Sequence, residues 1–195
     1  MGRQSWWHQF RNKLRQLGRC NLRSPQGGLS HRGAVPVLNR QDSPIPATIP
    51  ATTPARLECF DCPSDVDAVP KILAWLEGLQ LDLTAAVLWE CRIILVEGFT
   101  NAVRHAHGGQ TNASPVRLQI EVWPDWLEIQ IWDGGASFDF SAVLEAMRRQ
   151  NESEPLRYGS GRGLLLMEQV SDRLAYERRG DRNCLVARKR LNRRP

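Results

Sequence analysis

The segment from Thr84 to His105 constrains the fold of this chain more than any other feature. Apolar residues recur in it at the helical period of about 100° per residue and form one continuous stripe. The stripe consists of Leu88, Cys91, Leu95, Phe99, Ala102 and Ala106. The opposite side carries Glu90, Glu97, Asn101 and Arg104, with His105 at its edge. We predict a long helix with one face on a core, and its polar face fits either a solvated surface or a binding site.

The segments around this helix predict the other elements of the fold. Strands are expected over residues 57–62, 116–122, 127–132, 174–177 and 184–190, and helices over 69–79, 142–149 and 164–170, with a loop over 150–162. Turn residues at Pro124-Asp125 and Gly180-Asp181 separate two of the strand pairs. The order β-α-α-β-β-α-α-β-β predicts an α+β two-layer sandwich, in which a mainly antiparallel mixed sheet carries helices on one face.

The first 56 residues differ from the rest in charge and composition. They contain nine Arg or Lys and one acid, for a net charge of +8, whereas residues 57–195 have a net charge of −3. Six of the 12 prolines lie within residues 1–55, and such a segment has little apolar surface to offset the entropy lost on ordering. We therefore predict a basic, Pro-rich, disordered extension over 1–56 and one domain over 57–195. The pI of about 9.3 reflects the extension, so charge alone does not predict nucleic-acid binding.

Within the extension, four apolar residues recur at helical spacing among basic ones. These are Trp6, Phe10, Leu14 and Leu17. A basic amphipathic helix over residues 5–17 that touches a membrane surface or a partner fits this pattern, and so does an unstructured tail. The sequence has neither the roughly 18-residue apolar run of a membrane span nor the apolar core of a secretory signal. We expect a cytoplasmic protein.

The five cysteines do not form a recognisable framework. An odd number of cysteines without a secretory signal argues against disulfides. Cys59 and Cys62 form a lone CxxC motif, whereas a structural zinc ion needs four ligands. We expect both to be small residues in or beside a strand.

Two glycine-containing segments follow the long helix in sequence. Asp133-Gly134-Gly135 ends an expected strand, where a carboxylate can accept from an amine and glycine lets a flat ring approach the backbone. The loop from Gly159 to Gly163 leads directly into a helix, where backbone N–H groups and the helix dipole favour an anion. Either segment alone is a common pattern.

Together, and in this order, the three segments resemble the N, G1 and G2 boxes of GHKL (Bergerat-fold) ATPases. The core Glu97-Gly98-Phe99-Thr100-Asn101, the run into Arg104-His105, and the segment 161–167 followed by Asp172 are similar to the bacterial anti-sigma factor serine/threonine kinase branch in particular. The resemblance covers residues 57–191. It implies the histidine-kinase-like ATPase fold and an ATP site.

The resemblance also implies roles for individual residues. Asn101 would coordinate Mg²⁺, an ion that prefers oxygen ligands, and Glu97 would be the general base for an attacking hydroxyl. Asp133 would accept from the adenine amino group, and Gly135 would pass beneath the base. The implied ATP-binding set is Asn101, Arg104, His105, Asp133, Gly135, Ser160, Gly161, Arg162, Gly163 and Leu164.

The chain departs from the family pattern at two places. Ser137 stands where the G1 box ends in glycine, and Asn183-Cys184 stands where a Gly-Thr pair is often found near the last strand. Both departures concern the adenine pocket rather than the phosphate or metal ligands.

Two functions of different classes follow from the resemblance. The first is an ATP-dependent serine/threonine protein kinase, a transferase in transcription regulation, that phosphorylates an anti-sigma-antagonist protein and sequesters a sigma factor. The second is a nucleotide-gated protein-binding module with little or no phosphate transfer. Glu97 favours the kinase, because a binding module has no need of a base there. The resemblance also implies a homodimer, and we expect no direct contact with nucleic acid.

Overall fold

The computed structural model describes residues 53–106, 114–153 and 162–191. The predicted extension up to residue 52, including the candidate helix over 5–17, lies outside these ranges. The same is true of Ser160 and Gly161 and of the His105 side chain.

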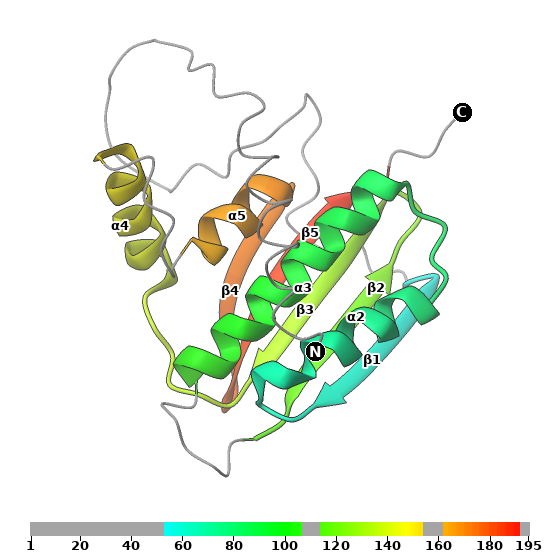
Figure 1. The fold of residues 1–195 in the computed structure, drawn as a ribbon, viewed down its shortest axis with the longest axis horizontal. Helices are drawn as coiled ribbons and strands as arrows, with labels where there is room; N and C mark the ends of the chain where they lie inside the picture. Colours follow the sequence, from blue (N-terminus) through cyan, green and yellow to red (C-terminus); the bar gives the residue numbers. More distant parts are fainter. Residues whose placement is uncertain (1–52, 107–113, 154–161, 192–195) are drawn as a thin grey trace, which may run out of the picture. The chain divides into compact units, whose positions relative to one another are not determined.

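The described elements follow the predicted order. They are β1 (Arg56–Cys62), a short 3-10 helix η1 (Val66–Ala68), α2 (Val69–Gly78), α3 (Ala85–Ala106), β2 (Val116–Val122), β3 (Trp126–Asp133), α4 (Phe140–Ser153), α5 (Gly163–Val170), β4 (Arg173–Arg179) and β5 (Arg182–Arg190). The described strands form one sheet in the order β1-β2-β3-β5-β4, and every neighbouring pair is antiparallel. Helices lie over one face of this sheet (Figure 1). The predicted α+β two-layer sandwich is therefore confirmed.

The helix α4 is longer than the sequence pattern indicated. It was expected over 142–149, yet it begins at Phe140 and continues to Ser153, into the expected loop. At its start, the Asp139 carboxylate accepts from the Ala142 backbone N–H at 2.9 Å, which caps the first turn. At its end, residues 150–153 include no glycine or proline and tolerate helical geometry, whereas Pro155 follows soon after.

The helix α3 is buried on more sides than one apolar stripe requires. It crosses the sheet over β3, between α2 and α5 (Figure 1). Ile93, Ile94 and Val96 lie outside the predicted stripe, yet each is at most 1% exposed. From the predicted polar face, Glu90 reaches the sheet and pairs with Lys189 of β5 at 2.9 Å. The expectation of a single buried face was too narrow, because a central helix contacts neighbours on three sides.

The central part of α3 approaches the sheet closely at Gly98. A Cβ atom at this position would lie 2.2 Å from Ile131 Cδ1 of β3, 3.2 Å from Leu185 Cδ2 of β5 and 3.5 Å from Met167 Sδ of α5. Glycine here lets the helix pack directly on the strands, which places the next turn of α3 beside the end of β3.

Gly98→Val is therefore expected to destabilise the protein by about 1–3 kcal/mol, the usual effect of overpacking a core. The measurement is the free energy of unfolding from urea denaturation. Gly78→Val is the matched control, because no heavy atom lies within 4 Å of a Cβ at Gly78. Equal losses of stability in the two variants would show that the close packing at Gly98 does not constrain α3.

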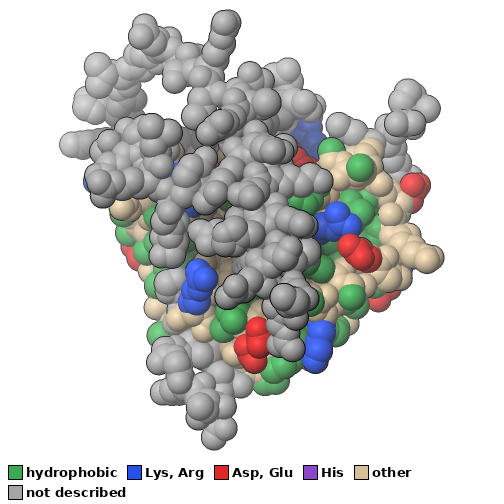
Figure 2. Space-filling model, viewed as in Figure 1, with side chains coloured by type: hydrophobic (Ala, Val, Ile, Leu, Met, Phe, Trp, Pro, Cys, Tyr) green, Lys and Arg blue, Asp and Glu red, His purple; other side chains and the backbone are tan. Residues whose placement is uncertain are grey.

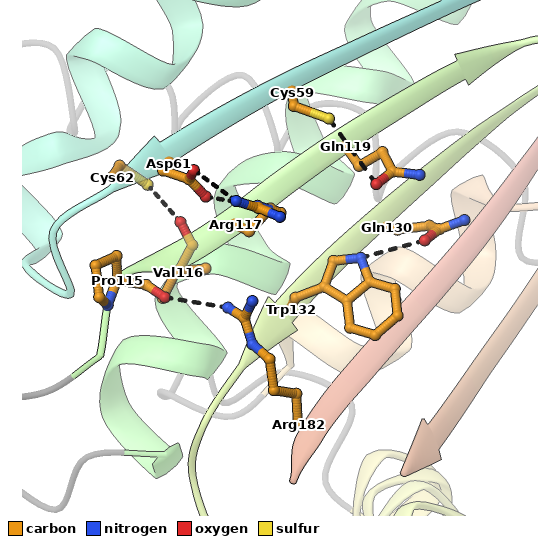
Figure 3. Close-up of polar contacts among 10 residues, drawn as sticks. All are labelled: Cys59, Asp61, Cys62, Pro115, Val116, Arg117, Gln119, Gln130, Trp132 and Arg182. Carbon is orange, nitrogen blue, oxygen red and sulfur yellow. Dashed lines mark hydrogen bonds and ion pairs between the residues drawn. The ribbon is translucent and has the colours of Figure 1, made fainter. Parts of the chain in front are cut away.

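Polar side chains on several strands form the contacts shown in Figure 3. Arg117 of β2 forms a two-point contact with Asp61 of β1, at 2.8 and 2.9 Å. On β3, the Trp132 indole N–H donates to Gln130 Oε1 at 3.2 Å. Arg182 donates to the Pro115 carbonyl at 3.4 Å. The first contact joins β1 to β2, the second lies within β3, and the third joins β5 to the residue before β2.

The cysteine prediction for β1 is confirmed. Cys59 and Cys62 both belong to this strand (Figure 3). Cys59 is exposed, whereas Cys62 is buried. The Cys62 thiol lies 3.5 Å from the Val116 carbonyl oxygen, and burial raises its pKa to about 12. Within the described ranges, no group of three or more His, Cys, Asp or Glu side chains could hold a metal ion.

The described side chains on the helix-covered face are mixed in character. Figure 2 shows basic and acidic side chains interspersed with apolar ones there. No helix among the described residues is long and apolar enough to cross a bilayer.

Candidate functional site

A cavity of about 350 Å³ lies beside the C-terminal end of β3. Its walls come from α3, α4, the start of α5 and the strands β3, β4 and β5. The lining residues are Gly98, Asn101, Ala102, Ile131, Asp133, Ala136, Ser137, Phe138, Val143, Met147, Leu164, Tyr176 and Leu185. Most of them are apolar, and the few polar groups converge from different elements, as in small-molecule sites.

Asp133 is the acidic residue of this cavity and is 7% exposed. It is the last residue of β3, and its Oδ1 accepts from the Gly135 backbone N–H at 2.9 Å. The same oxygen accepts from Asn183 Nδ2 at 2.7 Å. The carboxylate is thus held in a fixed orientation beside the Gly134-Gly135 turn.

The glycine turn after β3 is held from the neighbouring strands. Asn183 of β5 donates through Nδ2 to the Gly135 carbonyl at 3.1 Å. Arg178 of β4 donates to the same carbonyl at 2.9 Å and to Asn183 Oδ1 at 2.8 Å. Side chains from two strands therefore fix one wall of the cavity.

Asn101 supplies an unsatisfied polar atom on the opposite side. Its Nδ2 is buried and has no hydrogen-bond partner among the described residues, and the residue lines the cavity from α3. A buried polar atom without a partner costs about 1–3 kcal/mol, so native proteins seldom keep one without a reason. A ligand in the cavity would supply the missing partner.

Glu97 lies one helical turn before Asn101, against the start of α5. A Cβ atom at Gly163 would lie 2.5 Å from Glu97 Oε2, so glycine at this position makes room for the carboxylate. The Thr100 hydroxyl donates to the Glu97 backbone carbonyl at 3.1 Å and is itself buried. Gly163, the first residue of α5, and the long helix thus meet at this carboxylate.

Aromatic rings form the outer wall of the cavity. Phe138 and Tyr176 both line it, with ring centroids 4.6 Å apart, and Phe140 stacks on Tyr176 at 5.7 Å. Burial, followed by the negative charge of Asp133, raises the pKa of the Tyr176 hydroxyl. Flat apolar faces of this kind suit a planar heterocycle.

The structure brings several predicted site residues together. Asn101, Asp133 and Leu164 line the cavity, Gly135 contacts Asp133, and Glu97 contacts Gly163. Arg162 is half-buried at the N-terminal end of α5. Arg104 is exposed and is not among the lining residues. His105, Ser160 and Gly161 are the predicted site residues whose side chains or positions lie outside the described part of the chain.

The sequence pattern missed the residues that support the pocket from other strands. Asn183, Arg178, Phe138 and Tyr176 were not predicted as site residues, and Ser137 was noted as a departure without a role. One signal was available: Asn183 is a polar residue directly before the apolar run that begins at Cys184. Its partner could not be read from that signal, because the pairing of Asp133 with Asn183 depends on the β3–β5 register.

Comparison with known proteins agrees with this fold. The profile of the histidine kinase-like ATPase domain matches residues 62–189. A serine-protein kinase RsbW from Staphylococcus epidermidis is 31% identical over 114 residues, which cover 56% of this chain and 72% of that protein. An RsbW from Staphylococcus aureus is 27% identical with the same coverage.

A solved structure shares the fold. It contains the RsbU and RsbW domains of a Mycobacterium tuberculosis protein and superposes with a TM-score of 0.51 at 14% identity. The match covers 72% of this chain and 34% of that one, so the chain spans about a third of that structure's length. The chain belongs to the histidine kinase-like (GHKL) ATPase family, in its anti-sigma serine-kinase branch. The family resemblance expected from the sequence is confirmed.

Proposed function

We propose that this protein is an ATP-dependent serine/threonine protein kinase that acts on an anti-sigma-antagonist protein and binds a sigma factor. The observation that carries the proposal is that Asp133 and Asn101 line one cavity in a kinase-like ATPase fold, with Glu97 one helical turn before Asn101 and against the start of α5. Asp133 suits the amino group of a nucleobase, and Asn101 suits a metal ion bound to the phosphates. Glu97 suits the hydroxyl group that attacks the phosphate. The relatives named serine-protein kinase support the same reaction.

The nucleotide base would occupy the cavity at the end of β3. Asp133 would accept from its amino group, Gly135 would pass beneath the ring, and the aromatic rings of Phe138 and Tyr176 would cover it. The phosphates would lie toward the start of α5, where backbone N–H groups and the helix dipole attract negative charge. Arg162 and Gly163 stand at that end of the helix.

The residues present also fit a magnesium ion with the nucleotide. Asn101 lines the cavity, and its Nδ2 is buried and has no hydrogen-bond partner among the described residues. Rotation about the last side-chain bond presents the amide oxygen in place of the nitrogen. Mg²⁺ usually takes one or two protein oxygens and keeps several waters. When bound, it would neutralise phosphate charge.

Glu97 would act on the protein substrate rather than on the nucleotide. A carboxylate that lies one turn from Asn101 on α3 is placed to take the proton from a serine or threonine hydroxyl as the phosphate is transferred. Phosphoryl transfer depends mostly on positioning and charge neutralisation, so one base and one cationic centre are sufficient groups for the reaction. The Glu97 carboxylate lies against Gly163, so this base is next to the start of α5.

A nucleotide-gated binding module is the second candidate. The largely apolar cavity and the clamped Asp133 favour nucleotide binding whether or not phosphate is transferred. The two functions differ at Glu97, which a binding module does not need. Phosphate transfer to the partner is the measurement that separates them.

Asp133→Asn is expected to weaken ATP binding by about 1–3 kcal/mol, because the new amide places a donor beside other donors in a buried site. Titration calorimetry with ATP and Mg²⁺ measures the loss, and circular dichroism verifies folding. Asp139→Asn is the matched control, because Asp139 is exposed and caps α4 outside the cavity lining. If Asp133→Asn binds ATP as tightly as the parent, the base site lies elsewhere.

A further inference from the structure

Resting on the nucleotide binding proposed above, we propose that Asn183 is the positioning residue that sets base specificity. It holds the Asp133 carboxylate as a hydrogen-bond acceptor, so that the cavity selects purine nucleotides with a 6-amino group over those with a 6-oxo group. Asn183 is 1% exposed and faces Asp133 directly in the β3–β5 register. It stands where the sequence departs from the family's Gly-Thr pair.

Arg178 fixes which way the Asn183 amide points. A guanidinium only donates hydrogen bonds, and Arg178 Nη1 lies 2.8 Å from Asn183 Oδ1. The amide oxygen must therefore face Arg178, and the NH₂ group must face Asp133. Asn183 Nδ2 donates to Asp133 Oδ1 at 2.7 Å and to the Gly135 carbonyl oxygen at 3.1 Å, so each amide hydrogen has its own acceptor.

This orientation determines what Asp133 can offer to a ligand. Both hydrogen bonds to its carboxylate fall on Oδ1, from Asn183 and from the Gly135 N–H. Among the described residues, no donor contacts Oδ2. Because Oδ2 has no donor there, it is the oxygen that can accept from an amino group of a ligand, and it would repel a carbonyl oxygen. The pairing therefore discriminates at position 6 of the purine ring.

The test compares ATP with inosine triphosphate, which differs from ATP by a 6-oxo group in place of the 6-amino group. Affinities of the full-length protein for both nucleotides are measured with Mg²⁺. The parent should prefer ATP by about 10-fold or more, the factor expected for one hydrogen bond to a charged group. Asn183→Ala should lose most of that preference, because the carboxylate loses one of the two donors on Oδ1 and can rotate.

Two further variants separate positioning from general loosening of the pocket. Val143→Ala trims the cavity wall on α4 and should weaken both nucleotides by the same factor. Arg178→Ala removes the guanidinium that orients the Asn183 amide. Arg178 is exposed, so the fold should tolerate this substitution. It should lower the ATP preference in the same direction as Asn183→Ala, by a smaller factor, and it keeps the test valid if Asn183→Ala does not fold.

The outcomes distinguish this proposal from the proposed function. A parent protein that binds no ATP contradicts the function itself. A parent that binds ATP and inosine triphosphate equally, or variants at Asn183 and Arg178 that keep the full preference, overturns the specificity role and leaves nucleotide binding intact. The specificity role is supported if the preference for ATP over inosine triphosphate is lost in the Asn183 and Arg178 variants and kept in Val143→Ala.

Discussion

Glu97→Gln is expected to slow phosphate transfer to a protein hydroxyl by about 10²–10⁴-fold, the usual cost of removing a general base. ATP affinity should stay near the parental value, because the proposed role of Glu97 begins only when the substrate hydroxyl arrives. The substitution keeps the side-chain volume, and glycine at position 163 leaves room for either group. The expected result is therefore a large loss of rate with intact nucleotide binding.

The measurement pairs calorimetric ATP titration with the single-turnover rate of transfer from labelled ATP. Glu90→Gln is the matched control: it makes the same chemical change on the same helix, at a residue that pairs with Lys189 of β5, whereas Glu97 lies against Gly163. That variant should transfer at the parental rate. A parental rate in Glu97→Gln would place the base elsewhere.

Asn101→Leu is expected to damage ATP binding and transfer together. Leucine has a similar size and no oxygen, so the metal would lose its protein ligand and with it several kcal/mol of charge stabilisation during transfer. In the parent, ATP affinity should rise with Mg²⁺ concentration. In Asn101→Leu that dependence should largely disappear.

Asn101→Asp provides the conservative comparison at the same position. A carboxylate still offers an oxygen to Mg²⁺, so this variant should retain the magnesium dependence that Asn101→Leu loses. If both variants respond to Mg²⁺ as the parent does, Asn101 does not hold the metal, and its unpartnered amide needs another explanation.

The sequence predicted the parts of the fold and site that depend on local patterns. The periodicity of residues 84–105 predicted α3 to within one residue at each end. Alternation and turn residues predicted the β2–β3 and β4–β5 hairpins. Asp133 followed by two glycines marked the cavity, because the motif ends a strand and needs no distant partner to be recognised.

Features that depend on register or on several neighbours could not be predicted. Asn183 meets Asp133 only because β5 pairs with β3 at that position, fifty residues further along the chain. Tyr176 reaches Phe138 for the same reason, since β4 follows β5 in the sheet order. The burial of α3 on three sides arises from α2, α5 and the sheet together, which no helical period reveals. The length of α4 was underestimated because a polar helix end resembles a loop in sequence.

The most direct test of the central claim is phosphate transfer itself. The full-length protein is incubated with labelled ATP, Mg²⁺ and purified anti-sigma-antagonist proteins from the same genome, and complex formation is followed in parallel. Mass spectrometry then identifies the modified residue. The kinase account predicts that label moves to one serine or threonine of an antagonist that the protein binds, and that Glu97→Gln abolishes it. A stable complex with an antagonist and ATP, without any transferred phosphate, would contradict the account and leave the nucleotide-gated binding module.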